Sequence, residues 1–422
     1  MPYNNIIHKP SEDTLRRVFG ITKLRPWQEE VLPHILSGND VFVMVSTGGG
    51  KSLMYQYPAK LDVGEALTLV ISPTRSLQID QVKALNKKGI GAALLNSDLT
   101  KSERRDILEH LNKYTLLYCA PEQLRSKDLR SALERVTLKR VVIDEAHILP
   151  EAKHGFRPAY NEIGEFIHRC SPRPQIIALT ATATPKAREQ IKRDLKMQPD
   201  TATFVYPIRR TNLQIQIKHI KPNKKAGLSE SDVMLKTVED ILRQWDHKGS
   251  AIIYGTTVEQ VNLVKDYLKG RGFKLKKVTG KMDGAKRRNN QKVFIDGEVS
   301  IMAATNAFGL GVDKPDVRLV IHVGLPLTLE GYVQEIGRAG RDGKKSSCIL
   351  LYTKNDYKRN KQILQTGGDE AYQWSKQGMK AMRDFADNES SCAWRMIEKY
   401  FGEKPKKRCR ACSNCISHKL IQ

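Results

Sequence analysis

The sequence predicts an α/β protein with two consecutive parallel-sheet domains and a small helical, cysteine-rich region at its C-terminal end. Three observations support this organisation. Apolar segments of strand length alternate with helical segments, and the alternation stops and restarts near the middle of the chain. A glycine-rich loop at residues 47–52 directly follows an early strand. Four cysteines gather between Cys392 and Cys415.

The composition favours a polyanionic partner. The 422 residues include 71 Lys and Arg against 46 Asp and Glu, which gives a net charge of +25. Nucleic acid is the usual polyanion for such a protein, and the alternative is a basic protein that is merely soluble. No segment reaches the roughly 18 apolar residues of a membrane span, and the N-terminus lacks the apolar stretch of a signal peptide. We therefore expect no membrane partner and a cytosolic or nuclear location.

The first predicted domain covers residues 1–205. A short helix is expected after Ser11, because Ser11 can cap it, two acidic residues follow, and Gly20 can end it. Beyond this helix the chain has the βαβ rhythm of a parallel sheet covered by helices. Strands are predicted at 41–45, 67–72, 114–119, 140–144 and 175–180, with a clear helix at 76–89.

The second predicted domain covers residues 206–353. Its first part, 206–232, is polar, basic and irregular, and we interpret it as the passage between the domains. A strand is predicted at 250–255, then a helix that Thr256 and Glu259 are expected to open as a capping box. Further strands are predicted at 273–278, 299–305, 317–323 and 347–352. The strand signal is lost after this point, so 354–422 is predicted to form a separate helical region.

The glycine-rich loop is a candidate phosphate-binding loop (P-loop). Glycines allow the backbone amides to approach an anion closely, and a helix N-terminus favours negative charge. In such loops the lysine contacts the β- and γ-phosphates and the next hydroxyl contacts Mg²⁺. The alternative is a simple glycine turn, because Val45 stands where the strict pattern has glycine. The candidate residues are Thr47, Gly48, Gly49, Gly50, Lys51 and Ser52.

Two acidic residues form a second nucleotide element. Asp144 and Glu145 follow an apolar strand, at the edge of a parallel sheet where ligands bind. Asp144 can hold Mg²⁺ directly or through water, and Glu145 can orient and deprotonate an attacking water. A chance acidic pair after a strand is the alternative. This alternative is less favoured because the chain also carries Lys51 in a candidate P-loop.

Arg338 and Arg341 lie three residues apart in the segment QEIGRAGRDG. This spacing places both side chains on one side of a helical turn. An arginine that reaches a nucleotide from a second domain can neutralise charge developing on the γ-phosphate. A basic surface turn with glycine punctuation is an equally simple reading of these residues alone.

Four cysteines have the spacing of a metal site. Cys392, Cys409, Cys412 and Cys415 give the pattern C-x16-C-x2-C-x2-C, which suits tetrahedral Zn²⁺. An iron–sulfur cluster or free thiols are the alternatives. Four cysteine ligands leave no open position, so a structural role is expected. The other three, Cys119, Cys170 and Cys348, are expected to be buried apolar residues.

Taken in order, these segments resemble the RecQ family of DNA helicases, in helicase superfamily 2. The resemblance covers residues 11–416 and implies two tandem RecA-like domains followed by a RecQ-type zinc-binding subdomain. The Phe-Arg-Pro segment, the GRAGRDG segment and the cysteine pattern separate this family from DEAD-box RNA helicases. The matching segments are LRPWQEEVL (24–32), STGGGKS (46–52), VISPTRSL (70–77), LLYCAPEQL (116–124), VIDEAHIL (142–149), HGFRPAY (154–160), ALTATAT (178–184), AIIYGTT (251–257), AATNAFGLGVDKPDVRLVIH (303–322) and YVQEIGRAGRDG (332–343).

The resemblance assigns roles to individual residues. Arg25 and Gln28 match the adenine-reading motif, and the Gln28 amide has the donor and acceptor that an adenine edge needs. Arg341 is the preferred arginine finger. The ATPase residues implied are Lys51, Ser52, Asp144, Glu145, Arg338 and Arg341, and Thr180 and Thr182 match the motif that couples ATP state to domain movement. His154, Phe156 and Arg157 match the loop that senses single-stranded DNA.

Three features depart from the family pattern. Ile21 stands where an aromatic residue usually stacks on adenine, which makes selectivity for ATP less secure. Glu151 and Ala152 replace a glutamine and a tryptophan of the DNA-sensing loop, so we expect weaker stimulation of ATP hydrolysis by DNA. The sequence ends seven residues after Cys415, without the winged-helix and HRDC domains of many members, so modest or partner-assisted unwinding is expected.

The resemblance implies an ATP-dependent DNA helicase that moves 3′ to 5′ on single-stranded DNA and unwinds forked or tailed duplexes in repair and recombination. It implies ATP, Mg²⁺ and Zn²⁺ as cofactors, a monomer, and DNA-repair proteins as partners. The location is expected to be the cytoplasm and nucleoid in a bacterium or the nucleus in a eukaryote. One alternative is a DNA-dependent ATPase that translocates, anneals or remodels with little unwinding. Another is a nucleic-acid-binding scaffold with an inactive ATPase core, and an RNA helicase is a weaker third.

Overall fold

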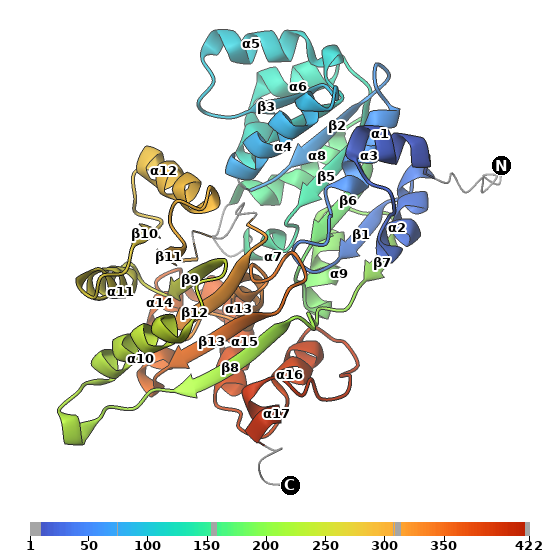
Figure 1. The fold of residues 1–422 in the computed structure, drawn as a ribbon. Helices are drawn as coiled ribbons and strands as arrows, with labels where there is room; N and C mark the ends of the chain where they lie inside the picture. The colour runs from blue at the N-terminus through green and yellow to red at the C-terminus, as the bar shows by residue number, and fades with distance from the viewer. Residues whose placement is uncertain (1–9, 74, 153–157, 307, 309–313, 418–422) are drawn as a thin grey trace. The chain divides into compact units, whose positions relative to one another are not determined.

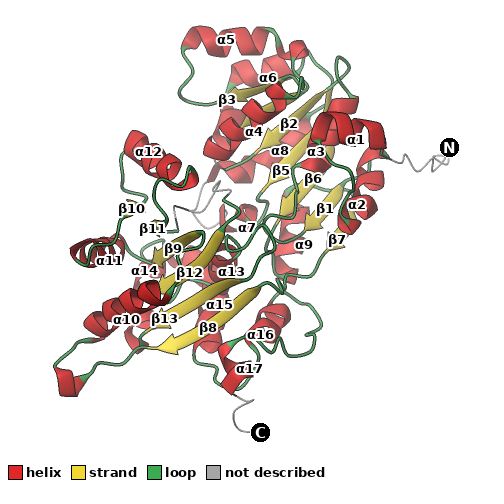
Figure 2. Cartoon of the chain, viewed as in Figure 1, coloured by secondary structure: helices red, strands yellow, loops and turns green. Residues whose placement is uncertain are grey.

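The computed structural model describes residues 10–73, 75–152, 158–306, 308 and 314–417. The chain divides into two compact units, Met1–Pro207 and Ile208–Gln422, and each has its own parallel sheet (Figures 1 and 2). No helix among the described residues is long and apolar enough to cross a membrane.

The first unit is built on a parallel sheet with the strand order β3-β4-β2-β5-β6-β1-β7. Alternate residues of β1 face opposite cores. Val41 and Val43 pack on one side of the sheet, and Phe42 and Met44 pack on the other. The continuous apolar pattern of this strand therefore reflects burial on both faces. The strands are β1 (Val41–Met44), β2 (Leu67–Ile71), β3 (Ala92–Leu95), β4 (Leu116–Cys119), β5 (Leu138–Asp144), β6 (Gln175–Thr180) and β7 (Ala202–Val205).

Helices connect these strands in the manner of βαβ units. The predicted first helix is confirmed: the Ser11 hydroxyl accepts from the Thr14 amide, and Gly20 ends the helix in the left-handed conformation. The helices are α1 (Glu12–Phe19), α2 (Pro26–Leu36), α3 (Leu53–Leu61), α4 (Arg75–Lys87), α5 (Lys101–Glu109), α6 (Lys127–Leu133), α7 (Ile148–Ala152), α8 (Ile163–Arg169) and α9 (Pro185–Asp194).

The second unit has a parallel sheet with the strand order β10-β11-β9-β12-β13-β8. Its first strand, β8, lies inside the segment that we predicted to be irregular, so that prediction was wrong. Its LQIQIKH sequence alternates apolar and polar residues, as expected for a half-buried edge strand. The strands are β8 (Leu213–His219), β9 (Ser250–Gly255), β10 (Leu275–Val278), β11 (Ile301–Ala304), β12 (Val317–Val323) and β13 (Ser346–Tyr352).

The helices of this unit include one correction to the predicted capping. Thr257, not Thr256, caps α11, and Gln260 completes its capping box, while the Thr256 hydroxyl donates to the carbonyl of Leu325. The C-terminal region is helical, as predicted, and α17 lies beside β8 (Figure 1). The helices are α10 (Glu230–Gln244), α11 (Val258–Gly270), α12 (Gly284–Ile295), α13 (Leu329–Ile336), α14 (Lys354–Gln365), α15 (Asp369–Ala386), α16 (Ala393–Tyr400) and α17 (Ser413–Ser417).

Candidate nucleotide site and zinc centre

The glycine-rich loop joins β1 to α3 in the first unit. The helix begins at Leu53, so Lys51 and Ser52 lie in the turn that leads into it. Gly48 and Gly50 have φ values of +76° and +81°, which residues with a Cβ rarely adopt. The backbone therefore folds into a tight loop at the carboxyl end of β1, as a P-loop requires.

Three side chains from the start of α2 donate hydrogen bonds to three consecutive carbonyls of this loop. Arg25 Nη1 donates to Gly48 O at 2.8 Å, and Gln28 Nε2 donates to Gly50 O at 3.1 Å. Between them, Trp27 Nε1 donates to Gly49 O at 3.2 Å. The structure thus brings the predicted adenine-reading residues onto the P-loop. From the sequence, Trp27 was expected only to help Ile21 pack against adenine, and its contact with the P-loop was not foreseen, although its position between Arg25 and Gln28 was a usable signal.

Neighbouring strands bring the other predicted ATPase residues to the same sheet edge. β6 lies between β5 and β1, so Asp144, Thr180 and the P-loop stand at the carboxyl ends of three adjacent strands. The Val45 amide donates to Thr180 O at 3.0 Å, which ties the start of the P-loop to β6. In parallel sheets this carboxyl edge is where ligands bind.

Asp144 is a buried carboxylate, 8% exposed. Burial, followed by the nearby charge of Glu145, raises its pKa to about 6, and the positive charge of Lys51 partly opposes the shift. Asp144 Oδ1 accepts from the Glu145 amide at 3.1 Å. Added positive charge would stabilise the ionised form of this carboxyl group. Carboxylate oxygens are also the kind of ligand that Mg²⁺ prefers.

Glu145 and His147 form a polar cluster with Thr180. Glu145 has a φ of +54°, an uncommon value for a residue with a side chain and one that often marks a functional site. His147 Nδ1 lies 3.4 Å from Glu145 Oε2 and 3.1 Å from Thr180 Oγ1. Burial alone would lower the pKa of His147, but its contact with Glu145 raises it above the usual value. The Thr180 hydroxyl also donates to Thr182 O at 3.1 Å, so the cluster extends to the second predicted threonine.

In the second unit, the loop after α13 carries Arg338 and Arg341. Arg338 is 8% exposed and interacts with the buried Tyr254. Arg210 donates hydrogen bonds to three carbonyls of this loop. These are Gly337 O at 3.0 Å, Ala339 O at 3.1 Å and the carbonyl of Gly340. Sequence reasoning missed Arg210, because nothing local distinguishes it from other basic residues.

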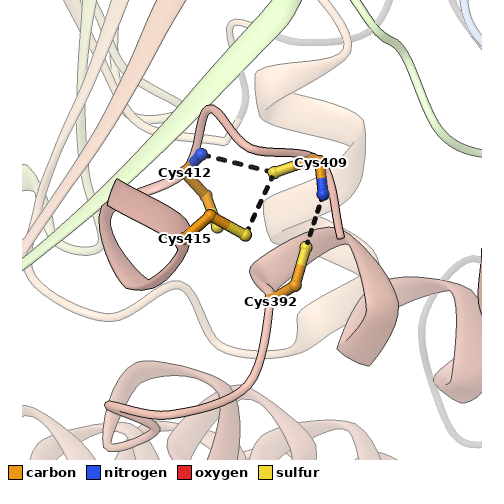
Figure 3. Close-up of side chains that lie close together, drawn as sticks. All are labelled: Cys392, Cys409, Cys412 and Cys415. Atoms are coloured by element: carbon orange, nitrogen blue, oxygen red, sulfur yellow. Dashed lines mark hydrogen bonds between the residues drawn. The ribbon is translucent and has the colours of Figure 1, made fainter. Parts of the chain in front are cut away.

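The four clustered cysteines converge in the second unit (Figure 3). Their sulfur atoms all lie within 4.8 Å of one another, and Cys409 Sγ is 3.9 Å from Cys415 Sγ. Tetrahedral zinc with Zn–S bonds of about 2.3 Å requires sulfurs about 3.8 Å apart, so the donor set fits. A hydrogen bond from the Cys412 thiol, together with backbone amides, lowers the pKa of Cys409 to about 4. Such a thiolate is the form that binds a metal.

Three further predictions concern the DNA-sensing loop. His154, Phe156 and Arg157 lie outside the described residues. Ala152, at the end of α7, is 1% exposed and packs in the core of the first unit. A tryptophan at this position would overpack the core.

Comparison with known families matches three consecutive parts of the chain. Residues 25–191 match the DEAD/DEAH box helicase family, and residues 234–343 match the helicase conserved C-terminal domain. Residues 354–416 match the RecQ zinc-binding family, which together with the four-cysteine cluster supports zinc as a bound metal.

Solved structures share the fold. The helicase Lhr of Mycobacterium smegmatis, bound to single-stranded DNA and AMP-PNP, has a TM-score of 0.64 at 21% identity. The match covers 83% of this chain and 49% of that one. Dbp5 of S. cerevisiae, bound to RNA and ADP BeF3, has a TM-score of 0.67 at 18% identity. That match covers 89% of this chain and 98% of Dbp5. At these identities the likeness concerns the fold.

Curated relatives are similar over most of the chain. The ATP-dependent DNA helicase Q-like 4B of Arabidopsis thaliana is 36% identical over 96% of this chain, which spans 36% of that protein. The "Probable ATP-dependent DNA helicase RecS" of Bacillus subtilis is 36% identical over 84% of the chain and 69% of the relative. The ATP-dependent DNA helicase RecQ of the same organism is 33% identical over 97% of the chain and 67% of the relative. The chain therefore belongs to the RecQ family of ATP-dependent DNA helicases.

Proposed function

We propose that this chain hydrolyses ATP to move 3′ to 5′ along single-stranded DNA and to unwind forked or tailed duplexes. The observation that carries the proposal is the sheet edge of the first unit. There the P-loop, the Asp144–Glu145 pair and Thr180 stand at the carboxyl ends of three adjacent strands in a chain of the RecQ family. The polarity comes from the family resemblance.

Different residues of the first unit would bind the phosphates, hold Mg²⁺, activate water and recognise adenine. Lys51 would contact the β- and γ-phosphates, while the amides of the glycine loop surround them. Ser52 and Asp144 would hold Mg²⁺, which supplies positive charge beside the phosphates. Glu145, positioned by His147, would orient and deprotonate the attacking water. Arg25 and Gln28 would recognise adenine.

The second unit would supply positive charge to the transition state. Arg341 is our choice for the arginine that stabilises the γ-phosphate, with Arg338 as its companion. An arginine of this kind commonly accelerates phosphoryl transfer by about 10³- to 10⁵-fold. The bonds from Arg210 to the loop keep its backbone fixed, and a fixed charge costs less reorganisation during the reaction.

The net charge favours a nucleic acid as the polymer, and the second unit carries most of this positive charge. Residues 208–422 contain 41 Lys and Arg against 23 Asp and Glu, a net charge of +18, whereas residues 1–207 contain 30 against 23, a net charge of +7. Phosphate contacts release counterions, so binding should weaken steeply with salt. His154, Phe156 and Arg157 are the proposed DNA-sensing residues of the first unit.

The decisive experiment compares the purified chain with Glu145→Gln on forked, 3′-tailed and 5′-tailed duplexes. We expect the parent chain to unwind forked and 3′-tailed duplexes with ATP, and the variant to bind ATP but not unwind. ATP hydrolysis and directional movement without strand separation would favour a remodelling or annealing ATPase. A parent chain that hydrolyses no nucleotide with any DNA, with zinc bound, would refute the proposal and favour a scaffold.

A further inference from the structure

Trp27 lies between the two predicted adenine-reading residues and, like them, donates a hydrogen bond to a carbonyl of the P-loop. It is the second residue of α2, and its side chain is 8% exposed. Its indole N–H donates to Gly49 O in a buried hydrogen bond of 3.2 Å. The indole is therefore fixed against the backbone of the P-loop.

The indole also packs against an aromatic ring. The ring of Tyr206 lies 5.8 Å from that of Trp27, and the Tyr206 hydroxyl donates to Glu30 Oε2 at 2.7 Å. Glu30 belongs to the same helix as Trp27. Trp27 thus has little freedom to rotate away, and its N–H is a preorganised donor.

Holding a carbonyl also orients the next amide. In a trans peptide the C=O and the N–H point in opposite directions. With Gly49 O bound to Trp27, the Gly50 amide points to the opposite side of the loop. Gly50 O is bound to Gln28, so the Lys51 amide in the next peptide also points away from α2.

These two amides are available for a ligand. The Gly49 amide donates to Ser46 O at 3.0 Å, whereas the amides of Gly50 and Lys51 donate to no acceptor among the described residues. Free backbone amides pointing into a glycine-rich loop bind the oxygens of phosphate groups.

We infer that Trp27 is a positioning residue of the nucleotide site, which turns the Gly49–Gly50 peptide so that its amide faces the phosphates. The inference rests on the proposed nucleotide-binding function. It assigns Trp27 to the phosphate side of the nucleotide, whereas Gln28 is assigned to the base. The two neighbours should therefore respond differently to a change of base.

The test is isothermal titration of the full chain with ADP and GDP, comparing the parent with Trp27→Phe, which keeps an aromatic ring but loses the donor. One neutral hydrogen bond contributes about 1 kcal/mol, so we expect affinity for both nucleotides to fall by about two- to tenfold. The ratio of the two affinities should not change. In steady state, KM for ATP should rise while kcat stays within about twofold, because the bond serves ground and transition states alike.

Trp394→Phe is the matched control, because its indole also donates to a buried carbonyl, Leu213 O at 3.3 Å, but in the second unit. It should leave nucleotide affinity unchanged. Gln28→Ala should alter the ratio of ADP to GDP affinity. If thermal unfolding shows that Trp27→Phe is not folded, Trp27→Met provides an apolar replacement without a donor.

The possible results separate the inference about Trp27 from the proposed nucleotide-binding function. Equal affinity of the parent and the folded Trp27 variant would overturn the inference while leaving the proposed function standing. A loss that changes the ADP-to-GDP ratio would place Trp27 on the base side and also overturn it. A parent chain that binds neither nucleotide would refute the proposed nucleotide site itself, and the inference with it.

Discussion

The guanidinium of Arg210 donates a 3.1 Å hydrogen bond to the carbonyl oxygen of Ala339, the residue that follows Arg338. The same group donates to the carbonyls of Gly337 and Gly340, and Asn212 Nδ2 donates to Gly340 O at 2.9 Å. Gly340 has a φ of +53°, and a Cβ there would lie 2.5 Å from that amide nitrogen. The loop that presents the two candidate catalytic arginines is therefore fixed by residues that directly follow the boundary between the units.

Arg210→Gln is expected to lower kcat for ATP hydrolysis by about 100-fold, because a small displacement of a catalytic charge costs about that much. Nucleotide affinity should change by less than about twofold, since the hydrogen bonds that the Arg210 guanidinium donates within the described residues go to carbonyls of this loop. Arg243→Gln, at a guanidinium 56% exposed on α10, is the control and should behave like the parent. An Arg210 variant with parental kcat would show that the loop holds its position without this residue.

The sequence was sufficient to predict the repeated α/β units because the buried strands are apolar throughout. β1 and β9, for example, bury every residue of their length. The edge strands β3 and β7, which are short, were missed, and β8 was read as irregular. An edge strand is buried on fewer sides and so has a weaker pattern. Its pairing depends on a neighbour far away in the sequence, which local patterns do not reveal.

The candidate sites also divide into residues that a local sequence pattern identifies and residues whose role depends on a distant contact. Lys51, Asp144 and the cysteines stand in motifs whose spacing carries the chemistry, so they could be named from the sequence. Trp27 and Arg210 act by donating to backbone carbonyls, and a carbonyl has no sequence signature. Arg210 lies 129 residues from Ala339, so only the folded chain shows the contact.

Asp62 and Arg140 form a buried ion pair in the first unit, at 7% and 4% side-chain exposure. Lys139 also contacts Asp62, and Arg140 donates to Gln175 Oε1 at 3.0 Å. Asp62→Asn should lower the free energy of unfolding by about 3–5 kcal/mol, because it leaves a buried guanidinium without its counter-charge. Urea unfolding followed by circular dichroism would measure this loss.

The matched control for Asp62→Asn is Glu109→Gln, which breaks an exposed pair with Arg105. Water and salt screen an exposed pair, so this variant should unfold almost as the parent does. Equal losses in the two variants would mean that burial does not set the strength of the Asp62 pair.

Cys412 is fully buried in the four-cysteine cluster, and the core of the second unit includes Cys392, Trp394 and Phe401 around it. Cys412→Ser should abolish stoichiometric zinc, measured by elemental analysis. It should also lower the midpoint of thermal unfolding by about 5 °C or more, since a unit of this size loses about 2–4 °C per kcal/mol. Cys170→Ser, outside the cluster, should keep both properties. One zinc retained per chain in Cys412→Ser would contradict the assignment.

The cysteines outside the cluster should differ in their reactivity towards iodoacetamide. Burial raises the pKa of both Cys119 and Cys348 to about 12, so at pH 8 only on the order of one thiol in ten thousand is ionised. Burial also raises the pKa of Cys170, but this residue is only half-buried and its sulfur donates to Phe166 O at 3.3 Å. We expect Cys170 to be the first cysteine alkylated in the zinc-bound chain.

Raising the pH from 7 to 9 should speed this alkylation, because the ionised fraction of a thiol below its pKa rises tenfold with each pH unit. Cys119 and Cys348, both 0% exposed, should remain unmodified over the same range, since the reagent reaches them only when the fold opens. Mass spectrometry after digestion would identify each site, and the chain in denaturant with EDTA should be alkylated at all 7 cysteines. Modification of Cys119 as fast as Cys170 in the native chain would show that β4 opens readily, which the full burial of Cys119 does not predict.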